Sequence, residues 1–399
     1  MSGIWPNDGI ADLCATPFYL FDEGVLEQRV AYLRRAFPAD AKICYAMKAN
    51  SFILKAASRS ADLIEVCSPG ELRVCRFLGI PDEMLVISGV NKEPEQMREL
   101  IAGRAHVHRY TVESRAQFDL IESIAREEGV CVPILIRITS GSQFGMEAAE
   151  ALSIIADLAS YPSVDFCGLQ FFSGTQKSSP NRIRRELRMM DDLIERITAE
   201  LSVEVAELEY GAGLPVDYCE EDPAAAEAAE EEFLTVLRES LDNMRFAGVK
   251  IVELGRSIAA SCGIYVTRVV DAKTNGGHNY AIVDGGKHQV AYYGQALALK
   301  PPVCRQLPEK PGGAVEEWAI CGSLCTTNDI LIKKIELSDL AIGDCLVFAN
   351  AGAYCMTEGI SLFLSRDLPS IYLADPAGEI ELVRPRFETS CLNTPNGLS

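Results

Sequence analysis

One lysine ends a nearly all-apolar run near the start of the chain. Residues 43–47 are apolar, Lys48 follows them, and a helical pattern comes next. A short apolar run bounded by a loop is typical of a strand buried on both faces, where an unpaired ammonium is costly. A desolvated lysine has a lowered pKa and forms Schiff bases with carbonyl compounds. The alternative is that Lys48 extends from the strand end into solvent.

Groups suited to a phosphate and to a protonated ring follow two later apolar runs. Gly211 and Gly213 come directly after the run 206–210, and small residues there let backbone N–H groups surround a phosphate. The run 250–254 contains Glu253 and leads into Gly255 and Arg256. A carboxylate and a guanidinium therefore belong to the same strand end.

An aromatic ring and a hydroxyl follow another run. Phe172 ends the run 166–172, and Thr175 lies three residues further on. Each feature alone has an ordinary explanation, since glycines after strands are usually turns and a Glu–Arg pair is usually a surface ion pair. Together with Lys48, however, they meet the requirements of pyridoxal 5′-phosphate: an amine that forms an imine, an aromatic plane, a carboxylate for the pyridine nitrogen and a phosphate cradle. We therefore predict that cofactor.

The spacing of the apolar runs predicts the fold. Helical patterns separate eight strand-like runs, at 42–48, 63–67, 84–88, 106–112, 133–138, 166–172, 206–210 and 250–254. Alternating strands and helices of this number favour an α/β fold in which a parallel sheet closes into a (β/α)₈ barrel. The active site of such a barrel lies where the strands end. A doubly wound open sheet is the alternative.

The pattern of apolar residues changes after Arg256. Short runs bounded by Gly, Asp or Asn replace the long helical patterns, at 259–270, 280–283, 317–321, 329–335, 344–349 and 371–373. This pattern is typical of an all-β domain. We predict an N-terminal strand segment over 1–25 that packs with the β domain, a cofactor-binding barrel over 26–257, the C-terminal β domain over 258–387, and a frayed tail over 388–399.

Charge and composition exclude several classes of partner. The chain has 37 Lys and Arg against 57 Asp and Glu, a formal charge of −20, which argues against nucleic acid and against an anionic membrane. Its fourteen cysteines are scattered without CxxC pairs, and no leader or apolar run of about 18 residues is present. We therefore expect a cytoplasmic protein with reduced thiols.

His106 and His108 share a strand face, but nothing completes a metal site there, so we expect no metal.

Several motifs of the first 257 residues resemble those of the group IV, barrel-type pyridoxal phosphate decarboxylases, which include diaminopimelate and ornithine decarboxylases. Residues 45–50, Tyr-Ala-Met-Lys-Ala-Asn, resemble the family's Schiff-base motif around Lys48, and residues 65–72, which begin with Glu65, resemble its second-strand motif. Residues 168–176 resemble the segment whose ring stacks on the cofactor and whose hydroxyl meets its phosphate. Residues 211–213 resemble the glycine run, and residues 253–256 resemble the EPGR signature with leucine in place of proline.

The resemblance extends into the predicted β domain. Residues 322–329 resemble the family's catalytic cysteine motif and residues 351–354 its GAY motif. The resemblance implies that Cys325 returns a proton to the substrate and that Tyr354 lies in the active site. It also implies a homodimer with two shared sites, since in the family this cysteine reaches the cofactor of the neighbouring subunit. From the residues alone, Cys325 could equally be a packed thiol and Tyr354 a core aromatic.

Departures from the family pattern concern the substrate. Phe172 replaces the usual histidine, and Thr175 replaces the usual serine. Thr326 stands where diaminopimelate and ornithine decarboxylases have an acid that meets the distal amino group. The substrate is thus expected to be an amino acid whose far end is tethered or capped, as in decarboxylases of secondary metabolism that act on carrier- or citrate-linked amino acids.

Two other functions remain open from sequence. The same barrel and lysine also serve amino-acid racemases, because deprotonation instead of decarboxylation requires only that a different bond be aligned. A non-catalytic homologue that binds the cofactor for regulation is the second alternative. The Cys325 motif and residues 351–354 argue against the racemase. The joint presence of Lys48, Glu253, Arg256 and Cys325 argues against the regulator.

Overall fold

The computed structural model describes residues 14–293 and 301–395. The chain forms two compact units. The barrel unit comprises Arg29–Pro215 and Ala228–Ser257, and the β unit comprises the described residues of Met1–Gln28, Val216–Glu227 and Ile258–Ser399. Residues 216–227, predicted to belong to the barrel, group with the β unit because Val303 N donates to the carbonyl of Tyr218 and because Tyr218 packs on Tyr292.

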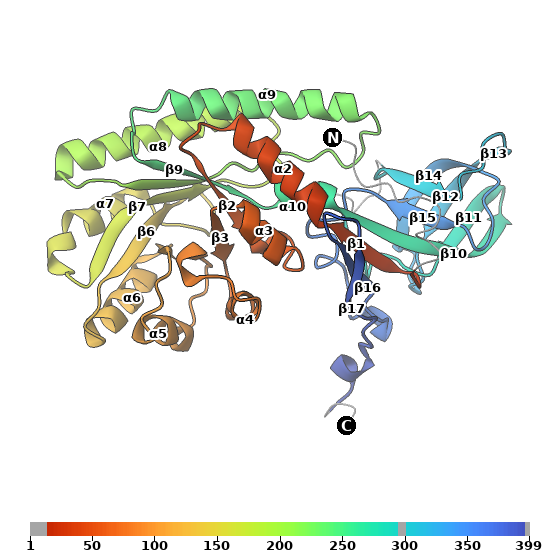
Figure 1. The fold of residues 1–399 in the computed structure, drawn as a ribbon, viewed down its shortest axis with the longest axis horizontal. Helices are drawn as coiled ribbons and strands as arrows, with labels where there is room; N and C mark the ends of the chain where they lie inside the picture. The colour runs from red at the N-terminus through yellow and green to blue at the C-terminus, as the bar shows by residue number, and fades with distance from the viewer. Residues whose placement is uncertain (1–13, 294–300, 396–399) are drawn as a thin grey trace. The chain divides into compact units, whose positions relative to one another are not determined.

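Eight parallel strands close into a barrel, which confirms the predicted fold (Figure 1). Closure is direct, since the first barrel strand pairs with both the second and the last. Each of the eight predicted runs contains or overlaps one strand. The strands are β2 (Lys42–Ala46), β3 (Leu63–Val66), β4 (Leu85–Ile87), β5 (Arg109–Val112), β6 (Val132–Ile138), β7 (Val164–Phe172), β8 (Glu207–Gly211) and β9 (Val249–Leu254).

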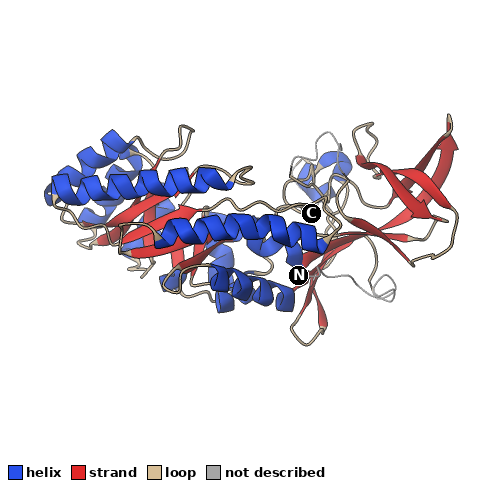
Figure 2. Ribbon diagram, turned by 90° about the horizontal axis from the view of Figure 1, so that it is seen from above, coloured by secondary structure: helices blue, strands red, loops and turns tan. Residues whose placement is uncertain are grey.

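Helices alternate with these strands and cover the outside of the barrel (Figure 2). Local signals fix their starts: Ser68 caps α4 by accepting a hydrogen bond from Glu71 N, and Ser114 caps α6 in the same way. None of the helices among the described residues is long and apolar enough to span a bilayer. The helices are α2 (Glu23–Ala36), α3 (Leu54–Ser60), α4 (Pro69–Phe77), α5 (Pro94–Ala102), α6 (Arg115–Glu127), α7 (Ala148–Ala156), α8 (Pro180–Leu201), α9 (Pro223–Asp242) and α10 (Arg256–Ala259).

The β unit is organised around its first strand. β1 pairs antiparallel with β10 and parallel with β16, and the side chains of Phe18, Leu20 and Ile264 belong to its core. Among the described residues of this unit, nine strands form one sheet: β1 (Phe18–Asp22), β10 (Gly263–Asn275), β11 (His278–Val283), β12 (Cys304–Leu307), β13 (Val315–Cys321), β14 (Ile330–Ser338), β15 (Cys345–Phe348), β16 (Ser370–Ala374) and β17 (Ile380–Arg384).

The β unit differs from the sequence expectation in four places. β12 and β17 were not predicted, since Arg305 and the polar residues of β17 interrupt their apolar pattern. β10 begins at Gly263, not at residue 259, because residues 256–262 form α10 and a 3₁₀ turn. The tail predicted to fray contains, in its described part, a 3₁₀ helix over Ser390–Asn393, where Asn393 Nδ2 donates to the carbonyl of Leu362.

Candidate active site

Lys48 lies at the carboxyl end of β2, within a 3₁₀ turn over Met47–Ala49. Its side chain is 39% exposed, so the expectation of a fully desolvated ammonium is wrong. Instead, Nζ forms an ion pair with Glu65 of β3 and lies 3.6 Å from Glu253 Oε1 of β9 and 3.8 Å from Cys67 Sγ. Pairing across the two neighbouring strands therefore holds this amine at the mouth of the barrel.

The two carboxylates beside Lys48 are buried and differ in acidity. Burial raises the pKa of Glu253, the negative charge of Glu65 raises it further, and the result is about 7. Burial would also raise the pKa of Glu65, but the charge and the hydrogen bond of Lys48 outweigh it, so this pKa is lowered. Hence Glu65 is the ionised partner of Lys48, while Glu253 can hold or release a proton near neutral pH.

A third carboxyl group in this cluster was missed by the sequence analysis. Glu209 of β8 is fully buried, and neither of its oxygens has a hydrogen-bond partner among the described residues. Burial, together with the charges of Glu253 and Glu65, raises its pKa well above the usual value, so this acid holds its proton more readily than an ordinary glutamic acid. Gln170 of β7 donates from Nε2 to Glu253 Oε2 at 3.3 Å. The available signal was an acid in the middle of a buried strand run.

Phe172 ends β7 and is partly buried. The guanidinium of Arg137, on neighbouring β6, lies 6.0 Å from its ring centroid and forms a 3.1 Å ion pair with Glu113. A Cβ at Gly211 would overlap the Phe172 ring. Gly211 therefore lets the Phe172 ring lie against β8. The sequence analysis had explained this glycine by phosphate binding alone.

The predicted phosphate residues come from three neighbouring strand ends. Arg256 is buried at the start of α10, directly after Gly255, and its Nε donates to Thr175 Oγ1 at 3.4 Å. Gly213 has a φ of +59°, and a Cβ there would overlap the carbonyl oxygen of Gly174. The loops after β7 and β8 thus pack against each other, with the guanidinium beside the first of them.

Cys325 and Thr326 belong to the β unit. They lie at the tip of the 322–329 loop between β13 and β14, where the Cys325 thiol is exposed and free. The loop folds around the buried carboxylate of Asp329, which accepts hydrogen bonds from the backbone N–H groups of Leu324 and Lys287. This anchoring presents the thiol at the surface of the unit, so Cys325 is not a packed core cysteine.

Tyr354 belongs to the same unit, in the turn after β15. It has a φ of +63°, unusual for a residue with a side chain, and it is partly buried. The segment 284–291 contacts both this turn and the cysteine loop, because Ala291 N donates to the carbonyl of Cys355 and Ser323 N donates to the carbonyl of Gly285. One segment therefore supports both motifs.

Two other features lie away from this site. His108 Nε2 is 3.1 Å from Glu207 Oε2, at the amino ends of β5 and β8. In the described parts of the chain, no group of three His, Cys, Asp or Glu is arranged for a metal ion. A hollow of about 690 Å³ lies between α8 and the segments that lead into β8 and β9. It is therefore at the amino ends of the strands, away from Lys48.

Comparison with known proteins defines the class. The model of the pyridoxal-dependent decarboxylases, described as their pyridoxal binding domain, matches residues 23–260. That is more than half of the chain, so the chain belongs to the pyridoxal-dependent decarboxylase family.

Individual relatives show which members of the family the chain is similar to. The chain is 27% identical over 362 residues to a diaminopimelate decarboxylase of Aquifex aeolicus, covering 86% of this chain and 83% of the relative. It is 27% identical over 392 residues to an L-glutamyl-[BtrI acyl-carrier protein] decarboxylase of Niallia circulans, covering 92% and 91%. The crystal structure of a diaminopimelate decarboxylase from M. jannaschii in co-complex with L-lysine has the same fold, with a TM-score of 0.85 over 98% of this chain and 94% of that one at 21% identity.

The protein is accordingly a pyridoxal phosphate-dependent, diaminopimelate decarboxylase-like amino-acid decarboxylase, a carbon–carbon lyase. The relatives favour this activity over the racemase and over the non-catalytic regulator. The donor set fits the cofactor: an amine between two carboxylates, a buried acid with a pKa of about 7, a partly buried ring, and a guanidinium–hydroxyl pair beside two packed loops.

Proposed function

We propose that the protein removes the α-carboxylate of an amino acid whose far end is capped or joined to a carrier. The observation that carries this proposal is the charge of the cysteine loop. Asp329 is the only ionisable carboxylate of residues 322–329, and it is buried and bound by two backbone N–H groups. Beside Cys325 the loop therefore offers the hydroxyl of Thr326 and no charge for a distal ammonium.

A relative supports the same choice. The Niallia circulans enzyme is named for its action on a glutamyl group joined to an acyl-carrier protein. A carrier-linked amino acid has no free distal charge, so a loop that lacks a free carboxylate would accept it without leaving a buried charge unpaired, which is strongly unfavourable. We accordingly propose a role in secondary metabolism.

Each residue has a proposed task. The cofactor supplies an electron sink for the charge left at the α-carbon by loss of CO₂. Lys48 would hold the cofactor through Nζ, and Glu65, which is paired with Lys48, would keep this Nζ positioned. Glu253 would hold a proton at the cofactor's ring nitrogen, and Cys325 would return a proton to the α-carbon of the substrate. Cofactor and substrate are held by the remaining residues: Phe172, Thr175, Gly211, Gly213, Gly255, Arg256, Thr326 and Tyr354.

Substrate preference tests the proposal. Free meso-diaminopimelate and ornithine should be poor substrates, and an amide- or thioester-capped amino acid should be better, as measured by kcat/KM with trapped CO₂. Thr326→Glu should shift the preference toward free diamino acids by about 1–3 kcal/mol, the value of one charge-assisted hydrogen bond. Thr327→Glu adds the same charge at the adjacent exposed residue and should leave the preference unchanged. Wild-type turnover of free diaminopimelate at about 10⁴ M⁻¹s⁻¹ or more would contradict the capped-substrate proposal.

We further propose a cytoplasmic homodimer with shared active sites. Free thiols such as Cys44, Cys67 and Cys325 suit a reducing compartment. In the β unit, a group of five apolar side chains is 43–52% exposed, four of them within residues 360–364 and the fifth at Phe387, as expected of a surface covered by a partner. This apolar patch comprises Ile360, Leu362, Phe363, Leu364 and Phe387.

A further inference from the structure

A second lysine of the barrel unit is completely buried, although the sequence analysis did not single it out. Lys177 lies between β7 and α8, and its side chain is 0% exposed. Nζ contacts three acceptors: Glu186 Oε2 at 2.8 Å, the hydroxyl of Tyr210 at 2.9 Å and the carbonyl oxygen of Gly211 at 3.2 Å. An ammonium has three N–H donors, so all of them are used within the protein.

The carboxylate of Glu186, the partner of Lys177, likewise has hydrogen bonds to both of its oxygens. Glu186 Oε2 also accepts from Tyr210 Oη at 2.8 Å, and Oε1 accepts from Ser173 Oγ at 2.6 Å and from Arg182 Nε at 2.8 Å. Burial would raise the pKa of Glu186, but the Lys177 charge and these hydrogen bonds outweigh it, so this pKa is lowered and the group is ionised. Four donors thus converge on one buried carboxylate.

This network joins the two loops that precede α8 and follow β8. Lys177 N donates to the carbonyl of Gly213 at 3.0 Å, while its Nζ donates to Gly211. Arg182 Nη2 donates to the carbonyl of Ser173 at 2.8 Å. A Cβ at Gly213 would lie 3.2 Å from Lys177 Cε. The backbone of both loops is therefore fastened to one ammonium–carboxylate pair.

Stability alone does not account for such a pair. A buried ion pair is often no more stable than apolar side chains of similar volume, whereas its directional hydrogen bonds fix geometry. Lys177 and Arg182 are positive and Glu186 is negative, so the network has a net charge of one positive unit. A positive charge next to the loops favours binding of a phosphate. Because its donors are all engaged, Lys177 acts on a phosphate through the loops and not by direct contact.

We propose that Lys177, paired with Glu186, is a positioning residue that holds the loops 173–176 and 211–213 in the conformation that binds the cofactor's phosphate. The proposal rests on the proposed assignment of these loops, with Arg256, to the phosphate. It assigns a function to a residue that takes no part in the decarboxylation chemistry itself.

The test compares two ligands of the whole protein, pyridoxal 5′-phosphate and pyridoxal, which lacks the phosphate. Binding of each is titrated by absorbance, and the bound phosphate is observed by ³¹P NMR. Lys177→Met should weaken binding of the phosphorylated ligand by about 10-fold or more, change pyridoxal binding by less than about 2-fold, and shift the ³¹P resonance. The double variant Lys177→Met/Glu186→Gln leaves no unpaired buried charge, and it carries the same expectation where the single variant fails to fold.

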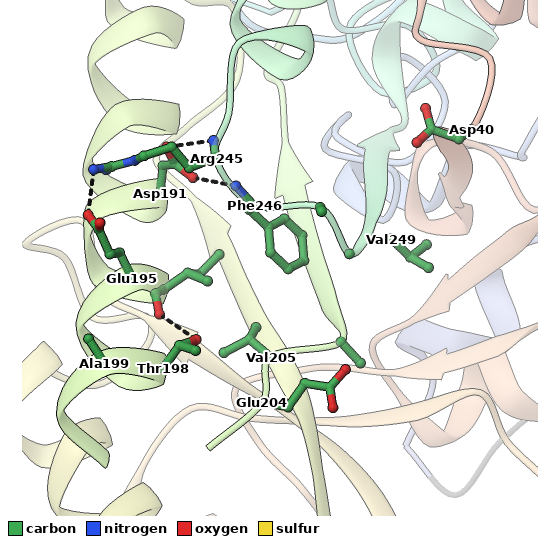
Figure 3. A pocket seen from close by; sticks show the side chains of 14 residues that line it. Asp40, Asp191, Glu195, Thr198, Ala199, Glu204, Val205, Arg245, Phe246 and Val249 are labelled. Atoms are coloured by element: carbon green, nitrogen blue, oxygen red, sulfur yellow. Dashed lines mark hydrogen bonds and ion pairs between the residues drawn. The ribbon is translucent and has the colours of Figure 1, made fainter. Parts of the chain in front are cut away.

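The matched control is another buried carboxylate of α8. Asp191 accepts hydrogen bonds from the backbone N–H groups of Arg245 and Phe246, at 3.0 and 2.9 Å, in the segment that leads into β9 (Figure 3). Asp191→Asn should therefore lower stability and leave the preference for the phosphorylated ligand unchanged. An equal loss for both ligands in the Lys177 variants, or no loss for either, would overturn the proposal.

The variant Arg256→Ala tests the assignment of the phosphate site separately from the positioning role of Lys177. Suppose that Arg256→Ala abolishes the preference for the phosphorylated ligand and the Lys177 variants do not. The assignment of Arg256 and the two loops to the phosphate is then supported, and the positioning function of Lys177 is refuted. If neither Arg256→Ala nor the Lys177 variants change that preference, the assignment of the cradle fails together with the inference drawn from it.

Discussion

At the scale of single residues, the barrel places more carboxyl groups around Lys48 than one ammonium can neutralise. Glu65 is ionised and paired with it, while Glu253 and Glu209 hold protons more readily than ordinary acids. Like charges in a buried cluster separate the pKa values of its members. The site thereby gains one group that stays charged and another, Glu253, that can exchange a proton near neutral pH.

The acidity of Glu253 predicts how stability depends on pH in the cofactor-free protein. Its pKa is about 7 in the folded state against a usual value of 4.5, so between these values the folded state binds more protons than the unfolded state. Raising the pH through this window should therefore cost at most about 3 kcal/mol of stability. Denaturant unfolding at pH 5 and pH 8 measures this difference.

Glu253→Gln should remove most of that pH dependence, since the amide does not titrate. Glu99→Gln, which alters an exposed carboxylate paired with Arg76, is the control and should keep the wild-type dependence. A wild-type and a Glu253→Gln protein that lose the same free energy between the two pH values would show that Glu253 does not carry a raised pKa.

At the scale of elements, the loops after β7 and β8 depend on one glycine. Gly213 has a φ of +59°, and a Cβ there would overlap Gly174 O. Gly213→Ala should thus cost more than the about 1–2 kcal/mol of left-handed backbone strain alone, and it should weaken binding of pyridoxal phosphate. Gly129 has a φ of +65° with no atom within 4 Å of its added Cβ, so Gly129→Ala isolates the strain. Equal unfolding free energies for the two variants would contradict the predicted overlap.

The elements also show what sequence can predict. The strands of the barrel were predictable because both faces of each strand are buried, which leaves apolar runs such as residues 43–47. Edge strands such as β17, with exposed Ile380 and Leu382, have no such pattern. Lys48, Glu253 and Arg256 could be proposed from the sequence because they lie at or near strand ends, where a barrel collects its functional groups.

Other residues of the site could not be predicted, for a physical reason. An acid inside a strand run, such as Glu209, is only a weak signal, and Lys177 lies in a polar loop where a lysine breaks no pattern. Their importance depends on partners distant in sequence: Glu253 is 44 residues from Glu209, and Tyr210 is 33 residues from Lys177. Only the closed barrel brings these groups together. Burial of a charge is a property of the fold and not of the local sequence.

At the scale of the whole molecule, the proposed chemistry is divided between two units. Lys48, Glu253 and Arg256 belong to the barrel unit, whereas Cys325 and Tyr354 belong to the β unit. Exposed apolar side chains such as those of the apolar patch often mark an interaction site. Both features agree with the proposed homodimer, in which a cyclic pair of subunits forms two equivalent sites.

Subunit complementation is the decisive experiment for this arrangement. If Cys325 acts on the cofactor bound by its partner, then mixing inactive Lys48→Ala and Cys325→Ala proteins creates dimers in which one of two sites has both residues. Statistical exchange makes half of the dimers mixed, so activity should recover to about a quarter of the wild-type value. Mixing Lys48→Ala with Glu253→Ala is the matched control, since both residues belong to the barrel unit of one subunit and no mixed site would be intact. Exchange of subunits is verified with differently tagged proteins. Recovery in neither mixture, despite exchange, would place Cys325 and Lys48 in the site of a single subunit.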